Sequence, residues 1–313
     1  MLPENFRPGF RIGYSPPQPM PPKPLALHPR VMTAADLPAA VRLNTIAGWN
    51  QTALDWQRFL RHSPTGCFVI EIEGQVVGTV ATIPYENFAW IGMVLVDPVF
   101  RNLGIGTQLL HRAIEHLDCL GISSLKLDAT PLGKPLYAKL GFIPEFDIER
   151  WILNRPSPPA SAQTAAHPAA PPVALDEAQL TELCDRDRPV FGADRGFLLR
   201  SLHADARDLA TVVPGREVLH GYAFGRKGLF ADHLGPCISL DATAAPHLLH
   251  SFLRQSSRET ILVDCLPSHR AFLDSVRAAG FAFSRPLTRM VRGPNAYPGE
   301  PASICAILGP EFG

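Results

Sequence analysis

The feature that most constrains this fold is a pattern that the sequence uses twice. In the first half of the 313-residue chain, Leu127–Asp128 ends an apolar run and is followed by a proline-containing turn, a helical run and Gly141–Phe142. In the second half, Val263–Asp264 and Gly280–Phe281 enclose the same succession. The repeat predicts an internal duplication, although any βαβ unit whose helix ends on glycine gives a similar pattern. The length of the chain also fits two units that each bury a core.

The first unit is predicted to contain a mixed sheet covered by helices. Alternating apolar runs, two of them joined by the turn Glu73–Gly74, indicate antiparallel strands, and a β-α-β-α-β succession follows them. The expected strands are 27–32, 67–72, 75–82, 88–96, 123–127 and 142–153, and the expected helices are 34–48, 52–61, 104–120 and 134–140.

The second unit repeats this order of elements. The expected helices are 176–187, 195–203, 244–254 and 269–279, and the expected strands are 208–213, 217–224, 230–240, 260–263 and 282–291. We therefore expect the α/β class, of the α+β type, duplicated in tandem.

Two proline-rich segments predict the domain boundaries. Residues 1–26 predict a flexible arm, and residues 155–173 predict an interdomain linker, because neither segment has the apolar periodicity of a packed element. A long surface loop within one domain is the alternative for the second segment. The predicted domains are therefore 27–154 and 174–313.

Charge and composition argue against several classes of partner. The 29 Lys and Arg residues balance 29 Asp and Glu residues without a basic run, so we expect no nucleic-acid partner. No apolar stretch has the length of a signal or transmembrane segment, so we expect a cytoplasmic protein without a membrane partner. The six cysteines are scattered without a CxxC pair, and we expect them to be reduced.

The stretch Met93–Thr107 carries the clearest chemical signal. It reads as a buried strand, a turn and a helix that begins near Gly104 and Gly106. Backbone N–H groups and the partial positive charge of a helix N-terminus suit a pyrophosphate, and Arg101 adds a charged contact. The Walker pattern does not fit because no Lys-Ser/Thr follows, and the dinucleotide pattern lacks its third glycine. Glycines that merely begin a helix remain an alternative.

Two motifs in the first half resemble those of one superfamily. Arg101–Gly106 resembles the R/Q-x-x-G-x-G motif of the GNAT superfamily of acyl-CoA-dependent N-acyltransferases, and Pro135–Phe142 resembles its L-Y-x-K-L-G-F signature. The resemblance covers the segment from His28 to Leu153, and the second half resembles a further, degenerate GNAT-like domain. It implies a mixed, mostly antiparallel sheet with a splayed parallel pair, flanked by helices.

The resemblance implies that acetyl-CoA binds along strand 88–96 and the loop after it. Backbone groups of Val94 and Val96 would bind the pantetheine arm, and the Val94 N–H would act as oxyanion donor to the thioester. The implied cofactor-binding residues are Val94, Leu95, Val96, Arg101, Asn102, Leu103, Gly104, Ile105, Gly106, Thr107 and Thr130. Asn102 and Thr130 depart from a common glycine and a common asparagine, but Asn102 tolerates the left-handed conformation.

The resemblance also implies that Tyr137 is the general acid that protonates the leaving thiolate. A half-buried helix tyrosine that packs on the core is the alternative. The base is not evident, because Trp90 stands where some family members carry glutamate. Glu86, in the preceding loop, is our candidate base, and a surface carboxylate without catalytic role or a water chain are the alternatives.

Acceptor selection in this superfamily usually involves the first two helices. Candidate residues of an amine pocket are therefore Trp49, Asn50, Asp55 and Trp56, with Asp55 attracting the cation. The structural alternative is that Thr52 and Asp55 form a capping box and that the tryptophans pack the helix onto the sheet.

The second half lacks the motifs of the first. After strand 230–240 the sequence Asp241–Pro246 contains neither the arginine nor the paired glycines, and Val276 takes the place of Tyr137. We expect this half to complete the acceptor site or to support the first half. Its scattered candidate metal ligands are His247, His250, Cys237, Cys265 and His269. They form no ordered ligand set, so we predict no metal, and we expect no Ser or Cys nucleophile paired with a histidine.

Two functions of different classes follow from these patterns. The first is an N-acetyltransferase that transfers an acetyl group from acetyl-CoA to a small-molecule or protein amine by direct attack on the thioester. The second is a non-catalytic acyl-CoA-binding sensor or scaffold, and a phosphate or nucleotide binder of another kind is a third hypothesis. The sequence leaves the amine, the acyl chain length and the oligomeric state open.

Overall fold

The computed structural model describes residues 27–155, 173–215, 219–241 and 243–313; the predicted arm and most of the predicted linker lie outside these ranges. We call residues 27–155 the first half and residues 173–313 the second half. The strands of the first half are β1 (Arg30–Val31), β2 (Cys67–Ile72), β3 (Gln75–Pro84), β4 (Ala89–Val96), β5 (Leu125–Ala129) and β6 (Ile143–Asn154). Its helices are η1 (Ala34–Asp36), α1 (Leu37–Ile46), α2 (Ala53–His62), η2 (Pro98–Phe100), α3 (Ile105–Cys119) and α4 (Lys134–Lys139).

The second half repeats the order of the first, as its sequence pattern predicts. Its strands are β7 (Val173–Ala174), β8 (Thr211–Val213), β9 (Gly221–Lys227), β10 (Asp232–Ser239), β11 (Thr260–Cys265), β12 (Ala282–Arg292) and β13 (Ile304–Ala306). Its helices are α5 (Glu177–Phe191), α6 (Gly196–Asp205), η3 (Arg207–Leu209), α7 (Ala244–Gln255), α8 (Arg270–Ala278) and η4 (Pro301–Ser303). Two short strands were not expected: β7 contains Val173, which the sequence places in the linker, and β13 follows the last predicted element.

The strands of the two halves join in one mixed sheet. In the described residues it has thirteen strands in the order β1-β2-β3-β4-β5-β12-β6-β11-β13-β10-β9-β8-β7. The pairs β4–β5 and β10–β11 are parallel, and the other pairings are antiparallel. The mixed, mostly antiparallel sheet and its tandem duplication are therefore confirmed.

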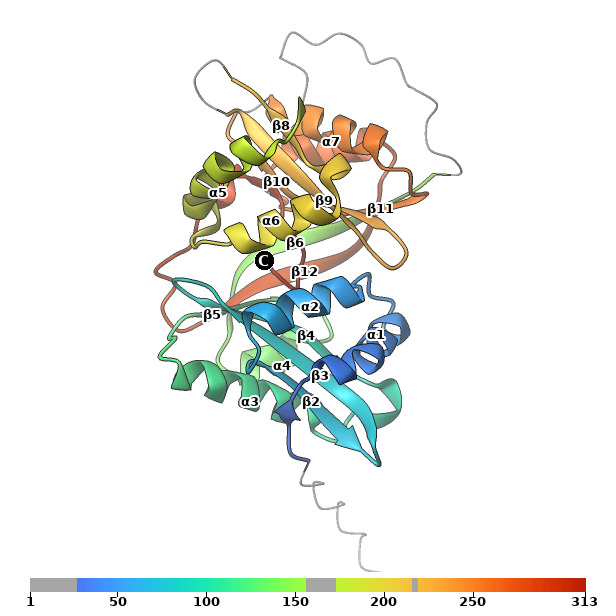
Figure 1. The fold of residues 1–313 in the computed structure, drawn as a ribbon, viewed down its shortest axis with the longest axis vertical. Helices are drawn as coiled ribbons and strands as arrows, with labels where there is room; N and C mark the ends of the chain where they lie inside the picture. The colour runs from blue at the N-terminus through green and yellow to red at the C-terminus, as the bar shows by residue number, and fades with distance from the viewer. Residues whose placement is uncertain (1–26, 156–172, 216–218, 242) are drawn as a thin grey trace, which may run out of the picture.

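The two halves exchange strands at the centre of this sheet. Strand β12 of the second half pairs with β5 of the first, and β6 of the first half pairs with β11 of the second. The two exchanged strands also pair with each other along nearly their whole length. Figure 1 shows β6 and β12 crossing between the lower and the upper half of the molecule. Each half is thus completed by a strand that the other half supplies.

Two buried ion pairs fix this exchange at equivalent positions. Arg150 of β6 donates to both carboxylate oxygens of Asp264 on β11, at 2.7 Å each. Arg289 of β12 donates to both oxygens of Asp128 on β5, at 2.9 and 3.0 Å. Burial disfavours the charged form of Asp264, but Arg150 outweighs this and holds the pKa of that carboxyl well below its usual range. Each bidentate ion pair therefore holds an exchanged strand in the sheet of the other half.

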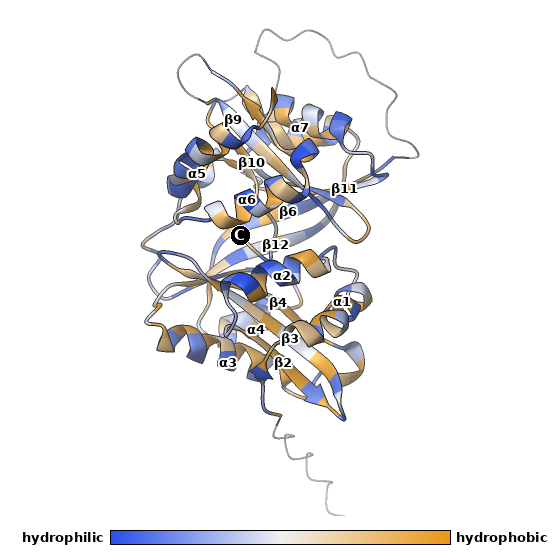
Figure 2. Cartoon of the chain, viewed as in Figure 1, coloured by the Kyte–Doolittle hydropathy of each residue, from blue (hydrophilic) through white to orange (hydrophobic). Residues whose placement is uncertain are grey.

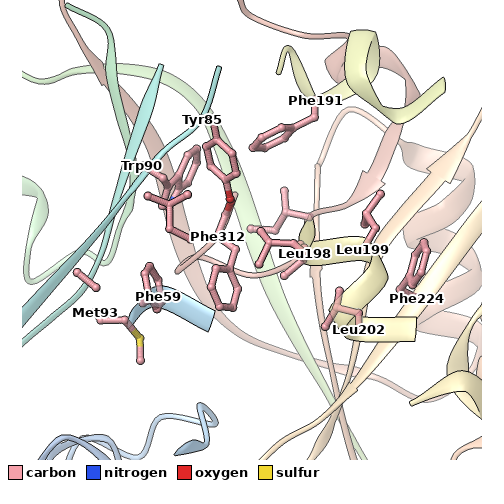
Figure 3. Close-up of a cluster of buried hydrophobic side chains, with 14 of the residues drawn as sticks. Phe59, Tyr85, Trp90, Met93, Phe191, Leu198, Leu199, Leu202, Phe224 and Phe312 are labelled. Carbon is pink, nitrogen blue, oxygen red and sulfur yellow. The ribbon is translucent and has the colours of Figure 1, made fainter. Parts of the chain in front are cut away.

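A hydrophobic core also crosses the boundary between the halves. Figure 2 shows apolar residues concentrated along the strands, with polar residues on the outer side of helices such as α5. Figure 3 shows aromatic side chains of both halves meeting between α2 and α6. There Phe59 stacks on Phe312 with ring centroids 4.8 Å apart, and Tyr85 contacts Phe191 edge to face at 5.0 Å. The two halves therefore share apolar packing as well as backbone pairing.

Replacing Arg150 with methionine should lower the free energy of unfolding of the full chain by about 3–5 kcal/mol, because the charge of Asp264 is then left buried without its main partner. Urea denaturation measures this change. The double variant Arg150→Met, Asp264→Asn removes the stranded charge and is expected to recover most of the loss. Equal destabilisation of the single and the double variant would show that the ion pair is not what holds β6 on β11.

Candidate functional site

The parallel strands β4 and β5 separate soon after they begin. They pair only at Ala89↔Leu125 and Trp90↔Lys126. The register of β4 against β3 then shifts, because Met93 adopts a left-handed conformation with φ of 55°. A non-glycine residue with positive φ is strained, and the Thr79 hydroxyl supports it by donating to the Met93 carbonyl at 2.8 Å. The bulge places the backbone of Val94 at the point where the two strands part.

The loop between β4 and α3 presents unpaired backbone donors. Asn102 has φ of 64° and Gly104 has φ of 81°, so the chain turns sharply before the helix begins. The expectation that Asn102 tolerates this conformation agrees with its geometry. Across the described ranges of the chain, the N–H groups of residues 102–107 form no hydrogen bond to backbone. Such a cluster of donors at a helix N-terminus is suited to an anionic group.

A cavity of about 670 Å³ extends from this loop along the end of β4. The residues implied by the superfamily resemblance line it, except Leu103, whose side chain is exposed. The lining residues from that set are Val94, Leu95, Val96, Arg101, Asn102, Gly104, Ile105, Gly106, Thr107, Thr130 and Tyr137. The structure thus brings the two sequence motifs together around one cavity.

A smaller inner chamber of about 40 Å³ continues this cavity into the protein. Trp49, Val94 and Tyr137 line both spaces. The second half supplies part of the wall of the chamber, through Arg285 and Leu287 of β12 and through Pro310 and Glu311 near the end of the chain. The chamber therefore lies between the two halves.

Tyr137 projects from α4 at the junction of the cavity and the chamber. Its ring packs beside Gly133, where an added Cβ would come within 2.8 Å of the tyrosine ring, and lies 6.2 Å from the ring of Phe142. Thr130 supports the same turn, because its hydroxyl accepts a hydrogen bond from the Gly133 N–H at 3.2 Å. Burial raises the pKa of Tyr137 to about 12, so its hydroxyl keeps its proton at neutral pH.

Three of the four expected amine-pocket residues lie elsewhere. Asp55 is completely buried and accepts hydrogen bonds from Arg58 at 2.6 Å and from Arg226 at 2.8 Å. Asn50 is bound to the backbone of Phe230 and Ala231, and Trp56 is wholly inside the core. The charge of Asp55 is therefore neutralised by Arg58 of α2 and by Arg226 of β9. Asp55 and Trp56 fit the alternative of a capping box and a tryptophan that packs in the core. Only Trp49 of the four lines the cavity and the chamber.

Glu86 lies in the loop before β4 and forms an ion pair with Arg188. Its side chain is 39% exposed and is not part of the lining of the cavity or of the chamber. Trp90, at the position where some family members carry glutamate, is buried and donates from its indole N–H to the Pro310 carbonyl at 3.0 Å. The surface-carboxylate interpretation of Glu86 fits this position.

Sequence reasoning missed several residues that line the inner chamber: Gln51, Asp128, Arg150, Arg285, Leu287, Pro310 and Glu311. Most come from the exchanged strands or from the segment after β13. No local pattern in the sequence indicates that these segments return to the first half. Asp128 is the exception, because it belongs to the repeated pattern with Asp264.

The corresponding gap in the second half is filled by the chain itself. Strands β10 and β11 pair in parallel as far as Leu234↔Val263, and beyond that point β13 pairs with both of them. The register of β10 on β9 places Pro236 in the position that Val94 has on β4. Proline has no N–H group, so this half lacks a backbone donor at the position that corresponds to Val94.

One contact in the second half corrects an expectation. The Cys305 thiol on β13 lies 3.7 Å from Nδ1 of His269, beside a cavity of about 430 Å³. Hydrogen bonds from Cys237 and then from His269 lower the pKa of Cys305 to about 6. A cysteine and a histidine are therefore paired here, although the sequence pattern gave no sign of it. All six cysteines lack disulfide partners.

The described residues lack both a membrane-spanning helix and a cluster of metal ligands. No helix in these ranges combines the length and the apolar character that a membrane span requires. The same residues contain no group of three His, Cys, Asp or Glu side chains arranged to bind a metal ion.

Comparisons with known proteins agree with this architecture. Residues 37–142 match a model described as the acetyltransferase (GNAT) family, and residues 183–305 match one described as an acetyltransferase (GNAT) domain. The uncharacterized N-acetyltransferase YitH of Bacillus subtilis is 22% identical over 210 residues, which are 67% of this chain and 72% of YitH.

Two solved structures share the fold over most of the chain. A Pyrococcus horikoshii protein, provisionally described as an acetyltransferase, has a TM-score of 0.75 at 20% identity, covering 92% of this chain and 96% of that chain. A tandem GNAT protein from the clavulanic acid biosynthesis pathway has a TM-score of 0.59 at 16% identity, covering 86% of this chain and 99% of its own. With a GNAT acetyltransferase model matched in each half, the chain is an acyltransferase of the GNAT family.

Proposed function

We propose that the first half transfers an acetyl group from acetyl-CoA to an amine by direct attack on the thioester. The observation that carries this proposal is a single cavity that connects the N–H groups of residues 102–107 to the bulge at Val94 and to Tyr137. Its volume of about 670 Å³ lies within the range of about 300–1,000 Å³ that is usual for small-molecule sites.

The loop is suited to the pyrophosphate of the donor. Its free N–H groups supply hydrogen bonds, and Arg101 is exposed beside them with a permanent positive charge. The proposed pantetheine arm runs along the open edge of β4, where the Val94 N–H would polarise the thioester carbonyl. The second half offers no equivalent site, because β13 occupies its gap.

In the proposed reaction the amine nitrogen bonds to the carbonyl carbon, and the carbon–sulfur bond breaks. Tyr137 gives its proton to the departing thiolate, and the nitrogen loses a proton to water in the cavity. Burial of Tyr137 raises its pKa to about 12, which keeps the hydroxyl protonated before the reaction. Burial around the Tyr137 hydroxyl also disfavours a thiolate anion beside it, which assists protonation of the thiolate.

Acetyl-CoA is expected to bind one site per chain in calorimetric titration. The double variant Arg101→Ala, Gly104→Asp should weaken this binding about tenfold or more, because it removes a charged contact and places a carboxylate at the phosphate loop. Asp241→Ala, in the corresponding loop of the second half, is the matched control and should bind normally. Binding of nucleotides that lack pantetheine, without binding of acetyl-CoA, would favour the phosphate-binder hypothesis instead.

Replacing Tyr137 with phenylalanine should lower kcat about 10²–10⁴-fold without changing the affinity for acetyl-CoA, because only the proton donor is removed. Release of the CoA thiol measures turnover, and Tyr297→Phe, at an exposed tyrosine, is the control. For the wild type, kcat should not decline until the pH approaches the pKa of Tyr137, about 12. An unchanged kcat in the phenylalanine variant would exclude Tyr137 as general acid, and binding without turnover of any amine would favour the sensor.

A further inference from the structure

One charged side chain in the wall of the inner chamber has no ion-pair partner among the residues that the structure describes. The other charged residues of its wall are neutralised: Asp128 by Arg289, Arg150 by Asp264, and Glu311 by Arg226. The remaining charged residue is Arg285. Arg285 is therefore the charged residue of this wall that forms no ion pair with the described residues.

Arg285 is held in the wall by the strand exchange. It lies on β12 opposite Arg150 of β6, at an irregular point in the register between the two strands. Its Nε atom is buried and has no hydrogen-bond partner among the described residues. None of the ion pairs found within those ranges includes Arg285 either. Burial, and then the neighbouring Arg150, lower the pKa of Arg285 from its ordinary value, and the charge of Asp264 opposes this shift.

An unpaired, partly buried guanidinium beside a second arginine is energetically unfavourable. Burying a charged donor without a partner costs free energy, and like charges directly opposite on adjacent strands repel each other. An anion that binds in the chamber next to the guanidinium would reduce both costs, because it supplies a hydrogen-bond partner and a compensating negative charge. The planar guanidinium donates two parallel hydrogen bonds, a geometry that matches a carboxylate.

Arg285 lines both the chamber and the larger cavity. Arg285 lines the chamber together with Val94 and Tyr137, and no residue of the loop 101–107 lines that chamber. The chamber, of about 40 Å³, holds a small group, since a single water needs about 10–15 Å³ by the same kind of measure. A carboxylate bound in the chamber would lie beside Val94 and Tyr137 rather than at the phosphate loop.

We propose that Arg285 binds a carboxylate group of the substrate next to the reacting thioester. The inference rests on the proposed function and specifies its substrate class. Two sources carry the same chemistry: an acceptor that is itself an amino acid, or an acyl group that ends in a carboxylate. In either case the second half selects the substrate, although it lacks a donor site of its own.

The test compares substrates that differ only in this carboxylate. One arm measures kcat/KM with acetyl-CoA for a panel of L-α-amino acids and for their carboxamides. The other arm compares succinyl-CoA with acetyl-CoA, using the carboxamides as acceptors. The wild type should prefer the carboxylate partner in one arm by about tenfold or more, and the arm identifies the source.

Arg285→Met should abolish this preference, and Arg285→Lys should keep only part of it, because lysine lacks the planar pair of donors. Arg292→Met, on the same strand but paired with Asp118, is the matched control and should keep the preference. Equal discrimination by the wild type and by Arg285→Met, or no preference in either arm, would overturn the proposal. Weaker acetyl-CoA binding by Arg285→Met would also overturn it, by assigning Arg285 to the donor.

A binding measurement separates this inference from the proposed function. The protein saturated with CoA is titrated with N-acetyl-L-alanine and with N-acetyl-L-alaninamide, and with succinate and succinamide. An intact protein that does not bind acetyl-CoA would refute the proposed function. Normal acetyl-CoA binding with equal affinity for the acids and their amides would refute only the role of Arg285.

Discussion

Pairing between β6 and β12 is the interaction on which the rest of this structure depends. Strand β6 of the first half completes the sheet of the second half, and β12 of the second half completes the sheet of the first. A buried bidentate ion pair holds each of these strands in register. Because the strands are central, the hydrophobic core and the inner chamber form across the boundary between the halves. Neither half has a complete sheet or a complete chamber without the other, so the stability of the fold and the shape of the site have the same origin.

The two copies of the fold differ most where their parallel strands part. In the first half the gap remains open beside the bulge at Met93, and backbone donors of the following loop face the cavity. In the second half β13 fills the gap, and Pro236 occupies the position that corresponds to Val94. The same architecture therefore yields a cavity in one copy and a packed strand in the other, and the difference depends on a short segment.

Much of this could be predicted from sequence, because the informative signals were local. Apolar periodicity located nearly all helices and strands, and the glycine loop and the Tyr137 signature indicated residues that do meet around one cavity. The missed features depend on contacts between distant segments. Asp55 satisfies a local capping pattern, but Arg226, which neutralises its charge, comes from the other half. Cys305 and His269 are close only because β13 fills a gap, and Arg285 reaches the chamber only because β12 is exchanged.

The mutual exchange of β6 and β12 also has a consequence for the ancestry of the chain. Two identical single-unit proteins that swapped this strand would form a closed dimer with two-fold symmetry, and joining their genes would give the present topology. In such a fusion one copy no longer needs a complete active site, but it must still supply the strand that completes the sheet of the other copy. Sequence change in the second copy is then restricted along β12 and less restricted where its parallel strands part, which is where the two copies differ.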